Sequence, residues 1–193
     1  MSTALQRLSP EEYLDMDRAS ESRFEYYFGE VIAMSGGTGS HSVIASNIGR
    51  EAGIALKGRP CRVYNSDMRT KTTTGVYTYP DVSIVCGKTQ YEDDREDVLL
   101  NPLVIFEVLS PSTELYDRGT KFTHYRSFPS LQAYVLVSQK CASVECYSRD
   151  ARGWLMTDAQ SLDQIIHIPG AEIDLSLSEI YYEVTFPPVE GLG

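Results

Sequence analysis

One glutamate interrupts an apolar segment of the chain. Residues 103–109 read Leu-Val-Ile-Phe-Glu-Val-Leu, so that Glu107 is the only charged residue in a run typical of a strand buried on both faces. Desolvation strongly disfavours an unpaired carboxylate in such a strand. Glu107 must therefore meet a metal, a cation or hydrogen-bond donors, or lie at the open end of the strand. A buried ion pair with a nearby arginine is the structural alternative.

Asp81 interrupts a second apolar segment, residues 79–85, directly after Pro80. The proline indicates a bend or an unpaired strand position, and an aspartate at a strand entry can simply satisfy backbone donors. Together with Glu107, however, Asp81 gives two acids on neighbouring predicted strands. Two such carboxylates can converge on one hard cation such as Mg²⁺.

Lys121 lies on the helix predicted directly after the Glu107 strand. Asp117, Lys121 and Tyr125 follow one another at intervals of four residues, which places them on one helical stripe. The alternative is a surface pair of Asp117 with Lys121, worth ~0.3–0.5 kcal/mol. If the helix packs across the sheet, the ammonium can instead stabilise a pentacovalent phosphate or orient an attacking water.

The elements that must position these residues follow from periodicity and from turn and capping residues. Helices are predicted at residues 10–17, 42–56 and 112–128, and an extended segment at 24–34. Strands are predicted at 61–70, 77–86, 103–109 and 133–137. The core order is therefore α-β-β-β-α-β with at least one parallel pair. Short segments at 143–148, 153–157 and 165–168 predict antiparallel hairpins that extend the sheet or cover an edge.

Composition indicates one α/β domain over residues 1–193, with 42% hydrophobic residues and a net charge of −10. That charge excludes a protein that coats nucleic acid through bulk electrostatics, so any DNA contact must be local. The basic residues between 57 and 71 could supply it, although a solvated face is the favoured explanation of the cluster taken alone; they are Lys57, Arg59, Arg62, Arg69 and Lys71.

The four cysteines form no C-x-x-C pair, so the sequence does not support a zinc ribbon or a thioredoxin motif, and reduced, structural cysteines are the simplest prediction; they are Cys61, Cys86, Cys141 and Cys146. No segment approaches the ~18 apolar residues of a membrane span, and the N-terminus carries no apolar signal segment. We therefore expect a cytoplasmic protein without membrane association.

The sequence resembles the Uma-two family of restriction endonuclease-like proteins, within the PD-(D/E)XK nuclease superfamily. The resemblance rests on Pro80-Asp81, on the run Glu-Val-Leu-Ser-Pro-Ser-Thr at 107–113, and on Asp117, Lys121 and Tyr125. It covers roughly residues 9 to 140. Further upstream the residues that match the family are Glu25, Gly29, His41 and Asp67.

The resemblance implies a restriction-endonuclease-like mixed sheet with Asp81 and Glu107 as ligands of Mg²⁺, for which Mn²⁺ can substitute. It implies Lys121 as the third catalytic group. The superfamily usually places this lysine two residues after the acid, but that position is Leu109 here, so the lysine has moved to the neighbouring helix.

Four further residues are candidates for supporting the site: Glu25, His41, Asp67 and Tyr125. Glu30 competes with Glu25 for this role, because periodicity cannot choose between them. His41 could be only a helix-start histidine, and Asp67 could merely pair with Arg62 or Arg69.

The sequence thus predicts a Mg²⁺-dependent endonuclease that hydrolyses phosphodiester bonds of DNA. The alternative is a non-catalytic module with the nuclease fold that binds nucleic acid or has a regulatory role. A nucleotide-binding protein that uses the glycine loop at 36–39 is disfavoured, because no Lys-Ser/Thr follows the loop. A homodimer is a further expectation, with an exposed apolar segment at residues 180–182 as its interface.

Overall fold

The computed structural model describes residues 7–34 and 36–188. Helix α1 (Pro10–Ala19) precedes strands β1 (Phe24–Tyr27) and β2 (Glu30–Ala33), helix α2 (Gly39–Ala55) and strands β3 (Cys61–Asn65), β4 (Arg69–Lys71), β5 (Tyr77–Thr78), β6 (Val82–Cys86), β7 (Val98–Leu99) and β8 (Val104–Leu109). There follow α3 (Glu114–Tyr116), the π-helical turn η1 (Asp117–Lys121), α4 (Phe122–Tyr125), β9 (Ala133–Ser138), β10 (Val144–Asp150), β11 (Gly153–Ala159), β12 (Ile165–Ile168), β13 (Ile173–Ser176) and α5 (Leu177–Ile180).

The main sheet has six strands in the order β11-β10-β9-β8-β6-β3. Strands β8 and β9 pair in parallel, and the other neighbours in this sheet are antiparallel. The predicted mixed α/β fold, its α-β-β-β-α-β core and its parallel pair are therefore confirmed. The C-terminal hairpins are confirmed as well: β10 and β11 extend the main sheet, while β12 and β13 form a separate two-stranded sheet.

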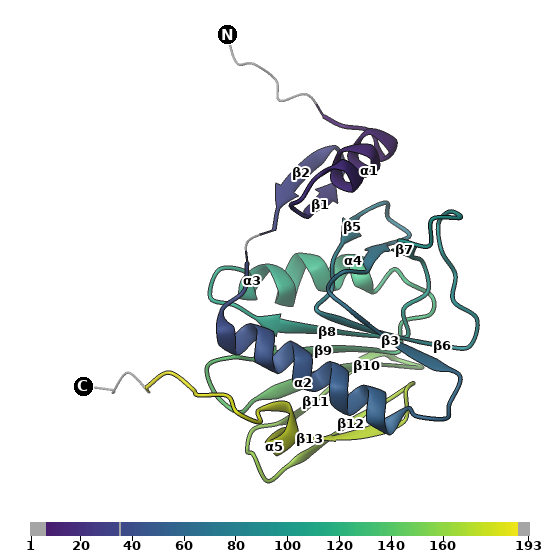
Figure 1. The fold of residues 1–193 in the computed structure, drawn as a ribbon. Helices are drawn as coiled ribbons and strands as arrows, with labels where there is room; N and C mark the ends of the chain where they lie inside the picture. The colour runs from purple at the N-terminus through teal and green to yellow at the C-terminus, as the bar shows by residue number, and fades with distance from the viewer. Residues whose placement is uncertain (1–6, 35, 189–193) are drawn as a thin grey trace.

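A second sheet has five strands in the order β2-β1-β5-β4-β7. In Figure 1 its strands β1 and β2 lie beside α1, above the main sheet. The existence of this second sheet corrects the predicted strands 61–70 and 77–86, because each of these is divided between the two sheets. Residues 66–68 form a turn between β3 and β4. Pro80 lies between β5 and β6, where it cannot donate a ladder hydrogen bond.

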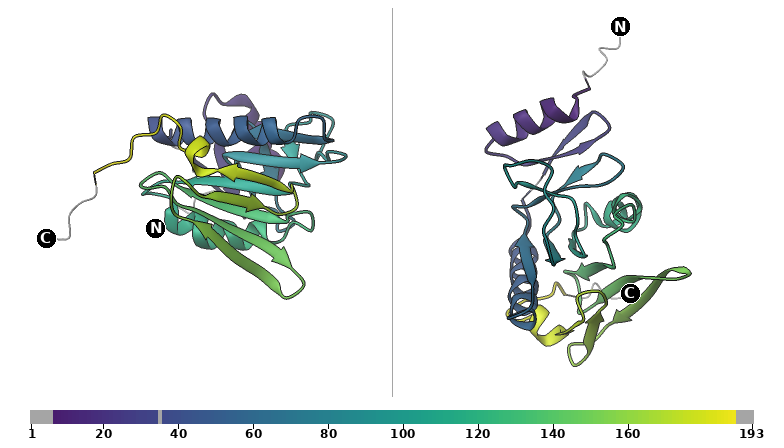
Figure 2. Two further views of the ribbon diagram at one scale, coloured as in Figure 1. Left: turned by 90° about the horizontal axis from the view of Figure 1, so that it is seen from below. Right: turned by 90° about the vertical axis from the view of Figure 1, so that its right-hand side faces the viewer.

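The two faces of the main sheet carry different layers. Val104, Phe106 and Val108 of β8 pack into one core with α2 and α5, whereas Ile105 and Leu109 pack into another with Tyr125 and Phe128. Figure 2 shows α2 on one side of the sheet and the α3–α4 segment on the other. Because side chains alternate along a strand, Glu107 shares the face of Ile105 and Leu109 and is directed toward α4.

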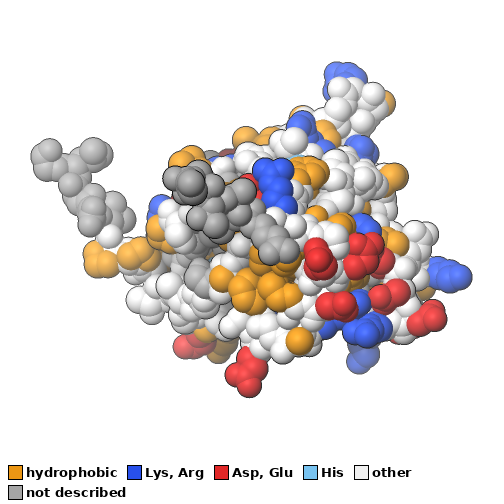
Figure 3. Space-filling view, turned by 90° about the horizontal axis from the view of Figure 1, so that it is seen from above, with side chains coloured by type: hydrophobic (Ala, Val, Ile, Leu, Met, Phe, Trp, Pro, Cys, Tyr) orange, Lys and Arg blue, Asp and Glu red, His pale blue; other side chains and the backbone are white. Residues whose placement is uncertain are grey.

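The predicted basic cluster between residues 57 and 71 is not one surface patch. Arg69 is only 4% exposed and forms an ion pair with Asp17 of α1, and Lys71 pairs with Glu92. On the face drawn in Figure 3, basic side chains stand at separate places and form no continuous field. The split of the predicted strand 61–70 explains this, because it places Arg62 and Arg69 in different sheets.

The prediction of four reduced cysteines is wrong for one pair. Cys61 and Cys86 stand opposite each other in the antiparallel β3–β6 register, with Cα atoms 4.0 Å apart, and form a disulfide. Cys141 is free and exposed, and Cys146 is free and buried. Pairing across two strands depends on a register that cysteine spacing does not reveal.

The predicted interface at residues 180–182 is also corrected. Ile180 is 0% exposed and Tyr181 4% exposed, because α5 packs them against α2 in the main core. Only Tyr182 is exposed, at 53%. None of the helices in the described residues is long and apolar enough to span a membrane.

Substitution of Arg69 by methionine tests the junction between α1 and the second sheet. We expect Arg69→Met to lower the free energy of unfolding by ~3–5 kcal/mol, because it strands the Asp17 carboxylate, which is itself only 5% exposed. Urea denaturation measures the loss. The exposed Arg62 provides the matched control, and Arg62→Met should change stability by no more than about 0.5 kcal/mol. Equal effects of both variants would contradict a buried pair.

Candidate active site

The two predicted acids meet where β6 and β8 begin to pair. Val82 stands opposite Phe106, so that one step further in the antiparallel register Asp81 faces Glu107. The Asp81 Oδ2 atom accepts a hydrogen bond of 2.7 Å from the backbone N–H of Val108. This bond fixes the Asp81 carboxylate beside the strand that carries Glu107.

Glu107 is 3% exposed and has two close partners on the helical side of the sheet. Its Oε1 atom lies 3.0 Å from Lys121 Nζ and accepts a hydrogen bond of 2.8 Å from the Tyr125 hydroxyl. The predicted alternative of an arginine partner is therefore wrong, because the paired cation is Lys121. Burial raises the pKa of the Glu107 carboxyl well above its ordinary value, Lys121 opposes this, and the neighbouring acids Asp81 and Asp117 add to it.

Lys121 is the centre of the cluster. Its Nζ atom lies 3.0 Å from Glu107, 3.3 Å from Glu25 and 3.5 Å from Asp117. Lys121 is 7% exposed, so the alternative of a surface pair with Asp117 is wrong and their contact is buried. Burial alone lowers the pKa of the ammonium, but the surrounding carboxylates outweigh it and raise the pKa well above the ordinary lysine value.

A π-helical turn, and not the regular α-helix predicted for residues 112–128, carries Asp117 and Lys121. The wider turn interrupts the helix between α3 and α4, and it buries Asp117 and Lys121. Tyr134 of β9 donates a hydrogen bond of 2.9 Å to the Asp117 carbonyl and so ties the turn to the sheet. Single-turn π-helices of this kind are frequent at functional sites.

Glu25 reaches the site from the second sheet. It is 7% exposed and accepts hydrogen bonds from the Tyr79 backbone N–H at 3.4 Å and from the Tyr116 hydroxyl at 3.5 Å. The competing Glu30 is on the exposed side of the hairpin, where its carboxylate lies 3.7 Å from Arg7. The alternation of β1 and the turn at Gly29 thus direct Glu25, and not Glu30, toward Lys121.

His41 stands at the N-terminus of α2, where Thr38 caps the helix and accepts a hydrogen bond of 3.2 Å from the His41 N–H. The imidazole Nε2 atom lies 3.3 Å from Asp81 Oδ2. The hydrogen bond to Asp81 raises the pKa of His41, against the effect of burial. A Cβ at Gly37 would lie 2.8 Å from the His41 Nδ1 atom, so glycine leaves the imidazole its place.

Asp67 is not brought to the site. It lies in the turn after β3, its side chain is 65% exposed, and it pairs with Arg23 of the neighbouring hairpin. Both sequence interpretations of Asp67 are therefore wrong, since it neither supports Glu107 nor pairs with Arg62 or Arg69. Asp117, which the four-residue spacing placed on the same stripe as Lys121, does reach the cluster. Tyr116, which no sequence pattern singled out, reaches it as well, through the contact of its hydroxyl with Glu25.

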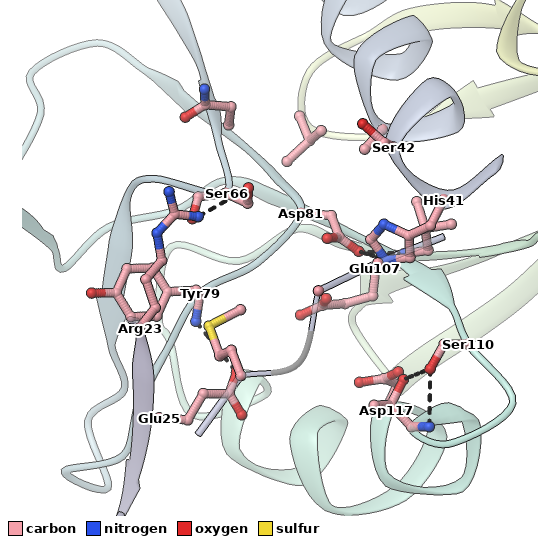
Figure 4. A pocket seen from close by; sticks show the side chains of 18 of the residues that line it. Arg23, Glu25, His41, Ser42, Ser66, Tyr79, Asp81, Glu107, Ser110 and Asp117 are labelled. Atoms are coloured by element: carbon pink, nitrogen blue, oxygen red, sulfur yellow. Dashed lines mark hydrogen bonds and ion pairs between the residues drawn. The ribbon is translucent and has the colours of Figure 1, made fainter. Parts of the chain in front are cut away.

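A cleft of about 1380 Å³ opens over these residues between the second sheet, the start of α2 and the end of β8. In Figure 4 the side chains of His41, Asp81 and Glu107 gather in one part of it, and Glu25 approaches from the side of Tyr79 and Arg23. The charged residues that line the cleft are mostly acidic; they are Glu21, Glu25, Asp81, Glu107, Asp117, Arg23 and Lys121. Five carboxylates therefore face two permanent cations and one histidine.

This donor set fits a hard divalent cation. Carboxylate oxygens are the preferred ligands of Mg²⁺, and two acids from adjacent strands share an open cleft with a surplus of negative charge. In the described residues no group of three or more His, Cys, Asp or Glu side chains is arranged to enclose a metal by itself. A hard cation in this cleft would need backbone oxygens or water as its remaining ligands, as Mg²⁺ commonly does.

Comparison with known proteins identifies the family. Residues 10–178 match the Uma2 family, which is described as "Putative restriction endonuclease". The chain belongs to the Uma2 family. This confirms the resemblance drawn from Asp81, Glu107 and their neighbouring residues, and the match extends beyond the 9–140 region on which the resemblance rested.

Two relatives in Synechocystis sp. (strain ATCC 27184 / PCC 6803 / Kazusa) span nearly the whole chain. The uncharacterized protein slr1290 is 35% identical and covers 93% of this chain and 94% of its own length. The uncharacterized protein sll1609 is 31% identical over 90% of this chain and 95% of its own.

A solved structure shares the fold. It is the crystal structure of "a putative nuclease belonging to DUF820" from Anabaena variabilis ATCC 29413. The two superpose with a TM-score of 0.74 at 20% identity, covering 90% of this chain and 97% of that chain. At this identity the likeness establishes the fold.

The pH dependence of stability tests the buried Glu107. The carboxyl titrates near 4.3 in an unfolded chain and has a raised pKa in the folded one, so stability is fully present below the unfolded pKa and falls as pH rises through the folded pKa. Glu107→Gln removes this contribution. The contribution of His41, whose pKa is also raised in the folded protein, is present in both the parent and the variant. With chelator present, the unfolding free energy of the variant relative to the parent should therefore increase as the pH rises above about 4.3, the carboxyl pKa of the unfolded chain, because only the parent loses this contribution. Parallel profiles would contradict it.

Proposed function

We propose that this Uma2 protein is a Mg²⁺-dependent endonuclease that hydrolyses phosphodiester bonds of DNA. The observation that carries the proposal is the contact of 3.0 Å between the buried Lys121 ammonium and Glu107, at the point where Asp81 faces Glu107 across two strands. Two carboxylates and a lysine at one cleft are the groups that metal-assisted phosphodiester hydrolysis needs. The family description supports the same chemistry.

Asp81 and Glu107 would hold the Mg²⁺ ion. When bound, Mg²⁺ polarises a phosphoryl oxygen and lowers the pKa of its water. Mn²⁺, which takes the same oxygen ligands, would substitute.

Lys121 would orient the attacking water and stabilise negative charge on the phosphate. Its ammonium has three N–H donors, and the nearest acceptors are carboxylates of Glu107, Glu25 and Asp117. It can share its hydrogen bonds with an attacking water or with a phosphate oxygen that gains negative charge in the transition state. Because its pKa is raised, Lys121 remains protonated at neutral pH and acts as a positive charge, not as a base.

Three further residues hold the acids in position. The Tyr125 hydroxyl donates to Glu107 Oε1, which leaves the other carboxylate oxygen for a ligand. Thr38 donates a hydrogen bond of 2.7 Å to Gln139, whose amide in turn donates 2.9 Å to the Leu109 carbonyl. The start of α2, with His41 on Asp81, is thereby fixed to the end of the Glu107 strand.

The cleft suits a polymer better than a small molecule. Its volume of about 1380 Å³ exceeds the ~300–1,000 Å³ of ordinary small-molecule pockets. An acidic lining repels phosphate unless a divalent cation is present. That charge disfavours the alternative of a metal-free nucleic-acid-binding module.

Charge removal at the two acids tests the metal dependence. Asp81→Asn and Glu107→Gln keep the shape of each side chain and remove one ligand charge. We expect the parent to gain melting temperature in Mg²⁺ or Mn²⁺ and to cleave supercoiled plasmid, and each variant to lose both properties while remaining folded. Thermal melts and gel electrophoresis measure this.

Glu30→Gln is the matched control, because Glu30 is an exposed carboxylate on the hairpin that carries Glu25. It should retain the metal-induced gain and the cleavage. A parent that binds DNA without a divalent cation, and neither gains stability from metal nor cleaves, would establish the binding-module alternative instead.

Substitution of Lys121 separates metal binding from chemistry. Lys121→Met preserves the length of the side chain and removes the cation that competes for the Glu107 carboxylate. Metal affinity should be equal or higher in the variant, while the cleavage rate should fall by about 10²-fold or more. Titration of the melting temperature with Mn²⁺ and plasmid cleavage measure the two effects. If the variant lost metal affinity and cleavage together, the role of Lys121 would be purely structural.

A further inference from the structure

Strand β11 is an open edge of the main sheet. It is the last strand in the order, and its seven residues pair with β10 without a bulge, from Asp150↔Gly153 to Val144↔Ala159. Its sequence, Gly-Trp-Leu-Met-Thr-Asp-Ala, contains neither proline nor lysine. Natural sheets protect exposed edges by bulges, prolines and lysines, and β11 has none of these.

The hydrogen-bonding direction of β11 follows from its turn. Asp150 and Gly153 close a two-residue turn, which makes them a hydrogen-bonded pair, and bonding alternates from there. The alternation requires the backbone N–H of Arg149, the partner of Trp154, to point away from β11. It does so, because it donates a hydrogen bond of 2.8 Å to the Gln132 carbonyl on the β9 side. The backbone groups of Trp154, Met156 and Asp158 therefore point away from β10, where no strand of the described residues lies.

The side chains along this edge are unusually apolar for a free surface. Leu155 is 52% exposed and Met156 50% exposed, on opposite faces of the strand. Figure 2 shows the β10–β11 hairpin reaching out from the body of the molecule in both views. Trp154 is held in place by Phe122, with ring centroids 5.2 Å apart, and by Arg149, whose guanidinium carbon lies 4.7 Å from the ring.

We propose that two copies of this chain form a symmetric dimer by antiparallel pairing of β11 with β11, with the two-fold axis at Met156. In this register Met156 pairs with its own counterpart, and Trp154 of each copy faces Asp158 of the other. All outward N–H and C=O groups of these residues are then bonded, and the two main sheets become one continuous sheet.

Charge selects a second copy over an unrelated strand. At one end of the edge, Arg152 in the turn before β11 is exposed and lies 3.6 Å from Asp150 of its own chain, and at the other end Asp158 is exposed. In the antiparallel dimer, Arg152 of each copy lies diagonally across from Asp158 of the other copy. Long side chains can span the distance between diagonal neighbours. Parallel pairing would instead bring like charges together.

Sedimentation equilibrium on the full chain tests the interface. We expect the parent to dimerise with rising concentration, and Met156→Lys, which places two ammonium groups at the axis, to weaken the dimer by at least about tenfold. Ile54→Lys is the matched control, because Ile54 is a 62% exposed apolar residue on α2, and it should leave the dimer unchanged. Far-UV circular dichroism verifies that each variant is folded.

A charge exchange tests the register. Arg152→Asp and Asp158→Arg should each weaken the dimer, and the double variant should restore it, because the opposite charges then meet again. A parent that stays monomeric at high concentration would overturn the proposal. So would a dimer that Met156→Lys leaves intact, or a double variant that is no better than the single ones.

Discussion

The buried ammonium of Lys121 is the interaction on which the site depends. Glu107, Glu25 and Asp117 come from three separate parts of the chain, and each would repel the others in a low-dielectric interior without the cation between them. The lysine does not neutralise the cluster completely, because several carboxylates share one ammonium. That surplus charge makes the cleft suited to a divalent cation and unsuited to bare phosphate.

The remaining architecture serves to bring these groups to one point. The π-helical turn places Asp117 and Lys121 against the sheet, β1 of the second sheet supplies Glu25, and the capped start of α2 supplies His41. The second sheet is itself held to α1 by the buried pair of Arg69 with Asp17. Damage to that pair, remote from the acids, should therefore disturb the wall that carries Glu25.

The net charge of −10 is consistent with this arrangement. A protein that bound DNA by a broad basic surface would need the continuous positive field that the scattered basic residues do not form. In the function that we propose, the affinity for phosphate would come from an ion bound by Asp81 and Glu107, so that recognition and chemistry would depend on the same two carboxylates. The outlying β10–β11 hairpin is separate from this cleft and presents its own surface for assembly.

The sequence by itself determined the fold class, the family, and the pair Asp81 and Glu107, because an acid in an apolar strand is a local signal that burial makes costly. The four-residue spacing also pointed to Lys121. Tertiary structure alone decided that Glu25, and not Glu30, faces the lysine, that Asp67 and Arg69 lie elsewhere, and that Cys61 opposes Cys86. These outcomes depend on strand register and on the division of two predicted strands between two sheets. Both are set by packing between residues far apart in the chain, which periodicity does not encode.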